Sequence, residues 1–400
     1  MRVLQLCNKP PLPAIDGGCI AMNNITMGLL SGGAEVKVLT IFTHKHDFLP
    51  DQMPADYVRQ TDIEGVFVDT RVNVVDAFAN FMTADSYNVS RFFSTDFDIK
   101  LTRCLKEREY DVVHLESLFM TPYIATIRRH SSARIVLRSH NLEFVLWEKM
   151  AQGARNIARK TYLNYLSRKL REYELSILAQ VDGIAAISTE DSKHFVQLGV
   201  KKPVAAIPFG LPADLYSPPE NNRPALALFH IGAMDWSPNL EGIVWFLEDI
   251  WPSIHQAFPQ LSLHLAGRNM PEDLRHGNFP CVVFDGEVPD ARAYMHSKAV
   301  MIVPLLSAGG IRVKIIEGMA CGKAIISTAV GAEGIDCIDG QHILLAETPE
   351  QWVGAVGQLI GSPQRIDELG RNARTLASTA YHSTEVTRRL LSFYKQLQGA

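Results

Sequence analysis

The sequence of 400 residues contains no closely spaced cysteine pair: its six cysteines are scattered, and no two of them form a CxxC motif. This spacing encodes neither a disulfide framework nor a zinc ribbon, and it fits a reducing compartment. Long apolar runs are also missing. The longest, at about residues 299–306, is far shorter than the roughly 20 residues of a membrane-spanning helix. The sequence therefore predicts a protein that is soluble, or at most peripheral to a membrane.

An excess of positive charge is absent as well, because 39 Lys and Arg residues face 43 Asp and Glu residues, a formal net charge of −4. Without a global basic field the chain is not expected to bind nucleic acid, and any phosphate ligand must meet local cations. The apolar N-terminal stretch is too short for a signal peptide and is interrupted by Lys9 and three prolines. We therefore expect a cytoplasmic protein.

Hydrophobic residues make up 47% of the chain, enough for a substantial core, and their pattern predicts two α/β halves. Residues 2–42 follow the order strand, turn-rich loop, helix, strand, which is a βαβ unit. Short apolar strand candidates alternate with helices from there to residue 188. A similar alternation begins again at residue 226, where Asn239 is the expected N-cap of the first helix.

Residues 207–224 are rich in Pro, Gly and Asn and read as a connection between the halves. We expect a first domain over 1–210, a linker over 211–225, a second domain over 226–380, and a C-terminal helix over 381–400 that crosses back. Both domains are predicted to be Rossmann-like, doubly wound parallel sheets that face each other across a cleft. Such sheets bind ligands outside the carboxyl ends of their strands.

The stretch from 307 to 328, SAGGIRVKIIEGMACGKAIIST, follows a predicted strand and carries the clearest signal of a binding site. Gly309 and Gly310 lie where the strand turns into a helix, and glycine lets a diphosphate approach the unpaired N–H groups of a helix N-terminus. Arg312 and Lys314 place two cations within one turn of that position. The stretch predicts an anion site.

Glu317 lies three residues after Lys314, on the same face of the predicted helix. A carboxylate at this place can accept both hydroxyls of a ribose. An ordinary surface ion pair between the two side chains, contributing a few tenths of a kcal/mol, fits this stretch about as well.

The chain has, in this order, a strand, a glycine-rich turn, basic residues, IIEGMACGKAIIST and GAEGI. This order resembles that of the family 4 retaining glycosyltransferases (glycosyl transferases group 1), which have the GT-B fold. The likeness extends over nearly the whole chain and includes PAIDGG, DVVHLESLF, LRSHNLEF, AAISTEDSKHF, IPFGLPADLYSP, HIGAMDWSPN, LHLAGRN and FDGEVPDARAYM, in the family's order. The resemblance implies a nucleotide-diphosphate sugar as donor, no metal and no other cofactor, and transfer with retention at the anomeric carbon.

By this resemblance Glu317 is the second glutamate of the family's paired-glutamate motif, which holds the nucleotide ribose. Gly309 occupies the place of the first glutamate, so the chain departs from the family pattern there. A loop that carries diphosphate-binding Arg and Lys in many members reads GAMDWSPN here (232–239) and has no cation. Arg312 and Lys314 are then the nearby positive charges, and we expect both to bind the donor diphosphate during transfer.

His140 directly follows the strand candidate RIVLRS, at a carboxyl strand end. By resemblance it is the family's active-site histidine, which lies close to the transferred sugar. A structural histidine that caps the next helix is the alternative.

Three further glycines are expected to bind the donor: Gly17 and Gly18, next to Asp16 in the first loop, and Gly267 at a strand end of the second half. The loop is expected near the donor phosphate or the acceptor, although Asp16 also suits a simple turn. For Gly267 the resemblance implies a place beside the nucleotide base.

Residues 155–178 carry six basic and two acidic side chains in a helical pattern. Such a helix can lie on an anionic membrane surface, which would suit a lipid-linked acceptor. It fits equally a solvated basic face on a helix packed against the first sheet. Peripheral contact with the inner face of a membrane therefore stays open.

Together these features predict a retaining, metal-independent glycosyltransferase that moves a hexose-type sugar from a nucleotide-diphosphate sugar to a glycan or lipid-linked acceptor in cell-surface polysaccharide synthesis. Two other classes remain open. One is a nucleotide-sugar epimerase or phosphorylase on the same scaffold, which would act on the donor without an acceptor. The other is a noncatalytic nucleotide-sugar-binding subunit.

Overall fold

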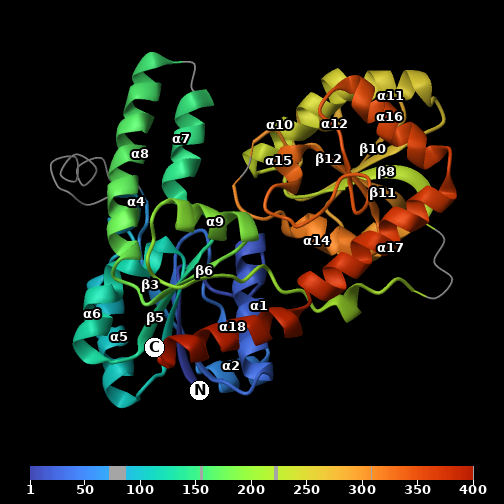
Figure 1. The fold of residues 1–400 in the computed structure, drawn as a ribbon. Helices are drawn as coiled ribbons and strands as arrows, with labels where there is room; N and C mark the ends of the chain where they lie inside the picture. Colours follow the sequence, from blue (N-terminus) through green and yellow to red (C-terminus); the bar gives the residue numbers. More distant parts are fainter. Residues whose placement is uncertain (72–86, 154–155, 220–223, 308, 400) are drawn as a thin grey trace. The chain divides into compact units, whose positions relative to one another are not determined.

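The computed structural model describes residues 1–71, 87–153, 156–219, 224–307 and 309–399. The chain divides into two compact units (Figure 1). Unit 1 consists of Met1–Gly210 together with Val386–Ala400, and unit 2 of Leu211–Glu385. Each unit is an α/β domain built on one parallel sheet.

The sheet of unit 1 has seven strands in the order β3-β2-β1-β4-β5-β6-β7, and every pair of neighbours is parallel. The order reverses beside β1, whose residue Val3 pairs with Val36 of β2 on one side and with Val112 of β4 on the other. The strands are β1 (Arg2–Cys7), β2 (Glu35–Phe42), β3 (Glu64–Phe67), β4 (Val112–Glu116), β5 (Arg134–Ser139), β6 (Gly183–Ala186) and β7 (Val204–Ala206).

Helices cover both faces of this sheet, because its strands are apolar on both sides. Leu4 and Leu6 of β1 belong to one core cluster, and Val3 and Cys7 belong to the other. The helices of unit 1 are α1 (Gly17–Ser31), η1 (Pro50–Gln52), α2 (Ala55–Thr61), α4 (Tyr87–Ser90), α5 (Thr95–Glu107), η2 (Leu118–Tyr123), α6 (Ile124–His130), α7 (Glu143–Gly153), α8 (Ile157–Leu178), α9 (Thr189–Gln197) and α18 (Ser383–Gln398).

The C-terminal helix α18 is part of the core of unit 1. Val386, Leu390, Phe393 and Leu397 are buried in the cluster that also contains the apolar side of α1. The two helices lie side by side (Figure 1). A Cβ on Gly28 of α1 would stand 2.2 Å from Thr387 Oγ1. Glycine at this position therefore makes room for α18.

Unit 2 contains a six-stranded sheet with the order β10-β9-β8-β11-β12-β13, again parallel throughout. Its strands are β8 (Ala225–Ile231), β9 (Leu263–Ala266), β10 (Val282–Gly286), β11 (Lys298–Val303), β12 (Ala324–Ser327) and β13 (Leu344–Leu345). Its helices are η3 (Ala213–Tyr216), α10 (Ser237–Trp245), η4 (Phe246–Ile250), α11 (Trp251–Ala257), α12 (Glu272–Arg275), α13 (Ala291–Ser297), α14 (Val313–Ala320), α15 (Ala329–Ala332), α16 (Pro349–Ile360) and α17 (Pro363–Ala380).

The prediction of two Rossmann-like parallel-sheet domains is confirmed by these two strand orders. Part of the expected linker belongs to unit 2: residues 211–219 lie in it, and Leu211 exchanges main-chain hydrogen bonds with Tyr381 and Ser383. Residues 220–223 of the linker lie outside the described residues. None of the helices in the described part of the chain combines the length and apolar character needed to span a bilayer.

Candidate active site

The glycine turn before α14 is held together by Arg312. Gly310 has a φ of 73°, a left-handed conformation that favours glycine. Arg312 is 4% exposed, and its guanidinium donates to the Gly309 carbonyl at 2.6 Å and to the Val330 carbonyl at 3.4 Å. It also lies 3.7 Å from the Glu333 carboxylate. Arg312 therefore cross-links the turn that the sequence predicted as the anion site.

Lys314, in the first turn of α14, reaches the loop that follows β8. Its ammonium donates to Asn239 Oδ1 at 2.6 Å and lies 3.4 Å from His230 Nε2. Because His230 Nδ1 is 3.1 Å from the Ile302 carbonyl, which can only accept, Nδ1 carries the proton and Nε2 is left to accept from Lys314. Asn239 in turn donates to the Ala233 carbonyl at 2.8 Å, which fixes its amide orientation.

This contact brings a cation to the loop 232–239, which has none of its own. A Cβ at Gly232 would stand 2.6 Å from Lys314 Nζ, so the ammonium fills the space beside that glycine. The expectation that Asn239 caps the helix is wrong. The helix α10 begins earlier, at Ser237, and the Asn239 side chain is engaged by Lys314 and the loop instead.

Burial and the nearby Arg312 guanidinium lower the pKa of Lys314 to about 7. The pKa of His230 is held well below its usual value by burial and by the adjacent Lys314 ammonium, so the imidazole is neutral. The amino group of Lys314 is thus shielded from water, and it can gain or lose its proton near neutral pH. A diphosphate beside it would favour the charged form and raise the pKa again.

Glu317 is one helical turn further along α14 and accepts a hydrogen bond from Tyr216 Oη at 2.8 Å. Tyr216 ends η3, in the segment expected to be a linker. Burial raises the pKa of Glu317. Among the described residues no ion pair joins Glu317 to Lys314, so the alternative of a surface pair between them is not what the structure contains.

Gly267 lies beside the same loop. Its φ is 155°, and a Cβ would stand only 1.8 Å from the Gly232 carbonyl oxygen, so a side chain cannot be accommodated. Its N–H donates to the Gly286 carbonyl at 2.7 Å. The structure therefore places Gly267, Gly232 and Lys314 next to one another at the carboxyl ends of β8 and β9.

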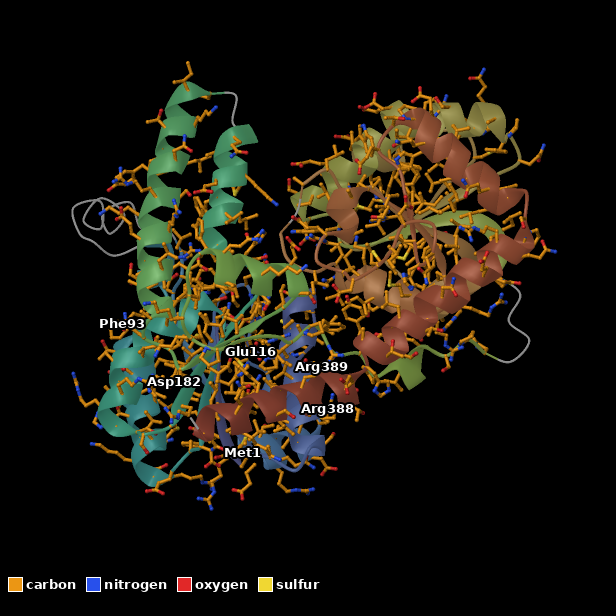
Figure 2. All side chains as sticks on the ribbon, in the orientation of Figure 1. Met1, Phe93, Glu116, Asp182, Arg388 and Arg389 are labelled. Carbon is orange, nitrogen blue, oxygen red and sulfur yellow. The ribbon has the colours of Figure 1, made fainter. Side chains whose placement is uncertain are left out.

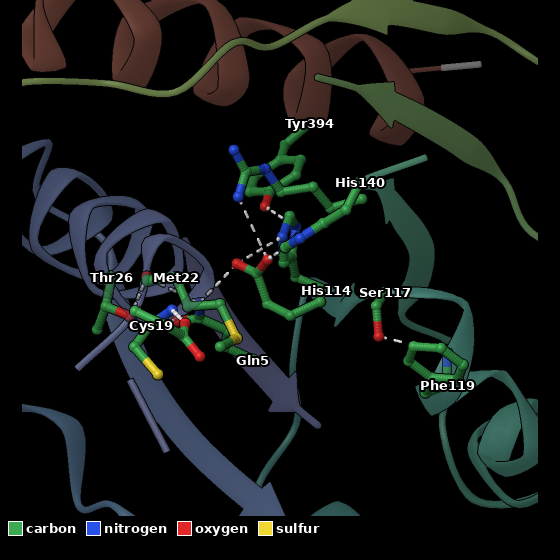
Figure 3. A network of polar contacts seen from close by, with 12 residues as sticks. Gln5, Cys19, Met22, Thr26, His114, Ser117, Phe119, His140 and Tyr394 are labelled. Carbon is green, nitrogen blue, oxygen red and sulfur yellow. Dashed lines mark hydrogen bonds and ion pairs between the residues drawn. The ribbon is translucent and has the colours of Figure 1, made fainter. Parts of the chain in front are cut away.

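In unit 1, His140 directly follows β5 and its Nε2 lies 3.2 Å from Oε2 of Glu116, the last residue of β4. Glu116 is completely buried, whereas the His140 side chain is 25% exposed. The carboxylate also accepts from Gln5 Nε2 at 2.9 Å and from Arg138 Nη1 at 3.4 Å. His114 Nε2 is 3.2 Å from Oε1 (Figure 3). Figure 2 labels Glu116 among the side chains of unit 1.

We call Gln5, His114, Glu116, Arg138, His140 and Tyr394 the Glu116 network. Burial opposes ionisation of Glu116, but the nearby Arg138 guanidinium and the hydrogen bonds from neighbouring side chains outweigh it and hold the pKa of this carboxyl well below its usual value. Burial lowers the pKa of His140. The network therefore joins an ionised, buried carboxylate to a partly exposed neutral histidine.

Sequence reasoning missed Glu116. The residue stands inside the quoted block DVVHLESLF, and the available signal was a charged side chain at the carboxyl end of an otherwise apolar, buried strand. A carboxylate is seldom fully buried unless cations surround it.

Asp16 is the N-cap of α1, where its side chain accepts from the Cys19 N–H at 2.9 Å. Lys9 Nζ lies 2.8 and 2.7 Å from its two carboxylate oxygens, and His46 Nε2 is 3.1 Å from Oδ2. These partners lower the pKa of Asp16 despite its burial. Lys9 Nζ also stands 2.8 Å from where a Cβ of Gly18 would be, so the glycine leaves space for the lysine.

The ligand atoms of Asp16, Cys19 and His46 lie within 4.8 Å of one another. Lys9 already neutralises the carboxylate, and burial raises the pKa of the Cys19 thiol to about 11. A bound cation would have to displace an ammonium and remove a thiol proton, so this group does not suit a metal.

The predicted site residues thus form two groups, each within one unit. Unit 1 holds Gly17, Gly18 and His140, and unit 2 holds the others, namely Gly267, Gly309, Gly310, Arg312, Lys314 and Glu317. In both groups the side chains gather at carboxyl strand ends or at the helix that follows.

Two family patterns match the chain. The pattern described as "Glycosyltransferase Family 4" matches residues 24–215, and the one described as "Glycosyl transferases group 1" matches residues 225–362.

An uncharacterized 44.6 kDa protein in the cps region of Klebsiella pneumoniae is 22% identical over 397 residues, 96% of this chain and 97% of that protein. Among solved structures, a sucrose-phosphate synthase from Thermosynechococcus elongatus has a TM-score of 0.71 at 17% identity and covers 99% of both chains. The Anabaena protein Alr3699/HepE in complex with UDP-glucose has a TM-score of 0.61 at 14% identity, covering 99% of this chain and 100% of that one.

Proposed function

Because this chain belongs to the group 1 / family 4-like glycosyltransferases, we propose that it transfers a sugar, with retention at the anomeric carbon, from a nucleotide-diphosphate sugar to a glycan or lipid-linked acceptor. The observation that carries the donor assignment is the Lys314 ammonium at the loop after β8, beside the glycine-rich turn that precedes α14. It supplies the cation that a diphosphate needs.

The neighbours support the class of donor and the setting. Alr3699/HepE binds UDP and UDP-glucose, and the relative in the cps region supports a polysaccharide-related role.

Within unit 2 we assign three roles. Lys314 contacts the donor diphosphate as a point charge, and Glu317 accepts the ribose hydroxyls. Arg312 keeps the Gly309–Gly310 turn in shape, because its guanidinium is buried against the carbonyls of that turn and of α15. A turn fixed in this way presents its N–H groups without reorganisation when charge develops on the leaving diphosphate.

Within unit 1 His140 hydrogen-bonds the transferred sugar. The sequence motifs carry no strong nucleophile at a fixed spacing, so we propose front-face substitution. The acceptor oxygen forms its bond to the anomeric carbon as the bond to the nucleotide diphosphate breaks, and a diphosphate oxygen takes the acceptor proton. The protein supplies position and electrostatic stabilisation, without a metal.

A transfer assay tests this function. The purified chain is incubated with radiolabelled UDP-, GDP- and ADP-sugars and with lipid-linked or oligosaccharide acceptors, and product anomers are assigned by NMR. Acceptor-dependent transfer with retention supports the proposal, and inversion contradicts the mechanism. Epimer formation or isotope exchange without an acceptor indicates the epimerase or phosphorylase class.

One specific observation favours the noncatalytic alternative, namely Gly309 at the place of the family's first glutamate. A chain that binds a donor tightly and neither hydrolyses nor transfers it, with any acceptor, belongs to that class.

A lipid-linked acceptor would place the protein beside a membrane, and α8 offers part of a surface for this. Lys160 and Arg168 are exposed on α8, and Ile157 at its start is 83% exposed. Arg155 of the predicted basic stretch lies outside the described residues. Co-sedimentation with vesicles that contain phosphatidylglycerol, compared with neutral vesicles, tests this contact.

Donor affinity is expected to fall as the pH rises above about 7. Lys314 has a pKa of about 7 in the free protein, and a bound diphosphate raises it, so binding takes up a proton over the range between the two values. The dissociation constant then increases up to about tenfold per pH unit. Calorimetry with UDP-glucose, whose diphosphate does not titrate there, measures this in buffers of different ionisation enthalpy.

The Lys314→Met variant should lose that pH dependence. An equal slope in both proteins would mean that another group takes up the proton.

Glu317→Gln is expected to weaken binding of nucleoside monophosphates as much as that of diphosphates, because its proposed partner is the ribose. Losing a charged hydrogen-bond acceptor costs about 1.5–3 kcal/mol, or roughly 10- to 150-fold in affinity. Titration calorimetry with UMP and UDP checks this. Glu368→Gln, an exposed glutamate paired with Arg365, is the matched control. Weaker binding of UDP alone would place Glu317 at the diphosphate instead.

A further inference from the structure

Glu116 is surrounded by polar side chains from three strands and from the position that follows one of them. Gln5 lies on β1, Arg138 on β5, His140 just after β5, and His114 two residues earlier on β4. Their polar atoms lie between 2.9 and 3.4 Å from the two carboxylate oxygens (Figure 3). The carboxylate is completely enclosed, so no substrate atom can reach it.

The geometry points to Glu116 as a positioning residue for His140: it holds the imidazole in the tautomer with the proton on Nε2 and leaves Nδ1 as an acceptor for a sugar hydroxyl. This inference rests on the proposed function, in which His140 faces the transferred sugar. Glu116 itself touches no reacting atom.

The hydrogen-bond partners of His140 determine its tautomer. An ionised carboxylate can only accept, so the 3.2 Å contact requires a proton on His140 Nε2. A neutral imidazole then has its lone pair on Nδ1. Among the described residues Nδ1 of His140 has no hydrogen-bond partner, and the side chain is partly exposed. The nitrogen left for substrate is therefore an acceptor.

The charges near His140 favour its neutral form. Burial, the Arg138 guanidinium and the Lys9 ammonium lower the pKa of His140, and only Glu116 raises it. Removing the carboxylate therefore lowers this pKa further and also releases the constraint on the tautomer.

The same carboxylate connects His140 to the C-terminal helix. His114, whose Nε2 faces Glu116, has its Nδ1 2.6 Å from Tyr394 Oη on α18. Burial raises the pKa of Tyr394, so the phenol keeps its proton. Tyr394, His114, Glu116 and His140 thus form one chain of polar contacts that runs from α18 to the residue after β5.

The test is histidine NMR combined with kinetics. Protein labelled with ¹⁵N-histidine is studied by long-range ¹H–¹⁵N correlation, with His140 assigned from a His140→Gln sample. In the wild type we expect neutral His140 with the proton on Nε2 and no detectable Nδ1–H form. In Glu116→Gln we expect both tautomers, a lower His140 pKa, and kcat reduced on the order of tenfold or more with unchanged donor affinity.

Glu174→Gln is the matched control. Glu174 is 1% exposed, accepts from the Phe144 N–H at 3.3 Å, and has a pKa raised by burial to about 8, so glutamine mimics its neutral form. It should leave the His140 signals and kcat unchanged.

An Nδ1–H tautomer in the wild type overturns the inference, and so does a folded Glu116→Gln protein with unchanged His140 signals. If the Glu116→Gln protein does not fold, because Arg138 is then buried without an opposite charge, the tautomer of His140 in the wild type still tests the inference. If the tautomer changes as expected and kcat does not, the positioning role stands and the proposed role of His140 in transfer fails.

Discussion

Lys314→Met is expected to weaken binding of the nucleotide-diphosphate donor by about 1.5–3 kcal/mol, roughly 10- to 150-fold, and to reduce kcat/KM by at least as much. Methionine is unbranched and only one atom shorter than lysine, and it removes the charge that faces the loop after β8. The fold should persist, because the change relieves the desolvation of an ammonium that has a pKa near 7. Calorimetry measures the affinity, and initial rates measure the transfer.

The control is Lys323→Met, a change at a lysine that is 3% exposed and has a pKa lowered by burial to about 8. Lys323 donates to the Lys298 carbonyl, away from the glycine turn. This variant should bind donor like the wild type. Equal affinity in Lys314→Met and the wild type would remove Lys314 from the donor site.

Arg312 calls for a different expectation. Truncation to alanine removes the donors that hold the Gly309 and Val330 carbonyls, so it should lower the melting temperature as well as donor affinity. The double variant Arg312→Ala, Lys314→Ala should therefore bind no diphosphate detectably, and its loss of stability should come from Arg312.

His140→Ala is expected to reduce kcat by about 10²-fold or more while donor affinity changes little. Its proposed partner is the reacting sugar and not the nucleotide, so the contact contributes mainly in the transition state. Single-turnover rates at saturating donor, with calorimetry for the nucleotide diphosphate, separate the two effects.

His194→Ala serves as the control, because the side chain of this histidine of unit 1 is 45% exposed and its Nε2 lies 3.6 Å from Glu190 Oε1. Weaker nucleotide binding with normal turnover in His140→Ala would instead put this histidine at the nucleotide.

The fold was largely predictable because its signals are local. The apolar positions 386, 390, 393 and 397 recur at helical spacing, and α18 spans residues 383–398 with those side chains buried. Buried parallel strands appear as short apolar runs for the same reason, since both of their faces are covered. The start of α10 was missed because Asn239, a good capping residue, has a stronger partner in Lys314.

The candidate site was only partly predictable because its contacts join residues far apart in sequence. Lys314 and Glu317 were expected to face the ligand, yet their partners Asn239 and Tyr216 lie 75 and 101 positions away. The spacing of residues along a helix does not predict contacts between residues so far apart in the sequence. The contacts of Arg312 are a similar case, since its burial and its hydrogen bond to the Gly309 carbonyl are not indicated by its position in the sequence.

The place of α18 in unit 1 affects the order in which the chain can fold during synthesis. Unit 2 is inserted between residue 210 and residue 386 of unit 1, so it leaves the ribosome complete while unit 1 still lacks its last helix. Until then the surface that receives Leu390 and Phe393 is uncovered, and His114 lacks Tyr394. A nascent chain held at that stage has its second domain formed and its first open to chaperones.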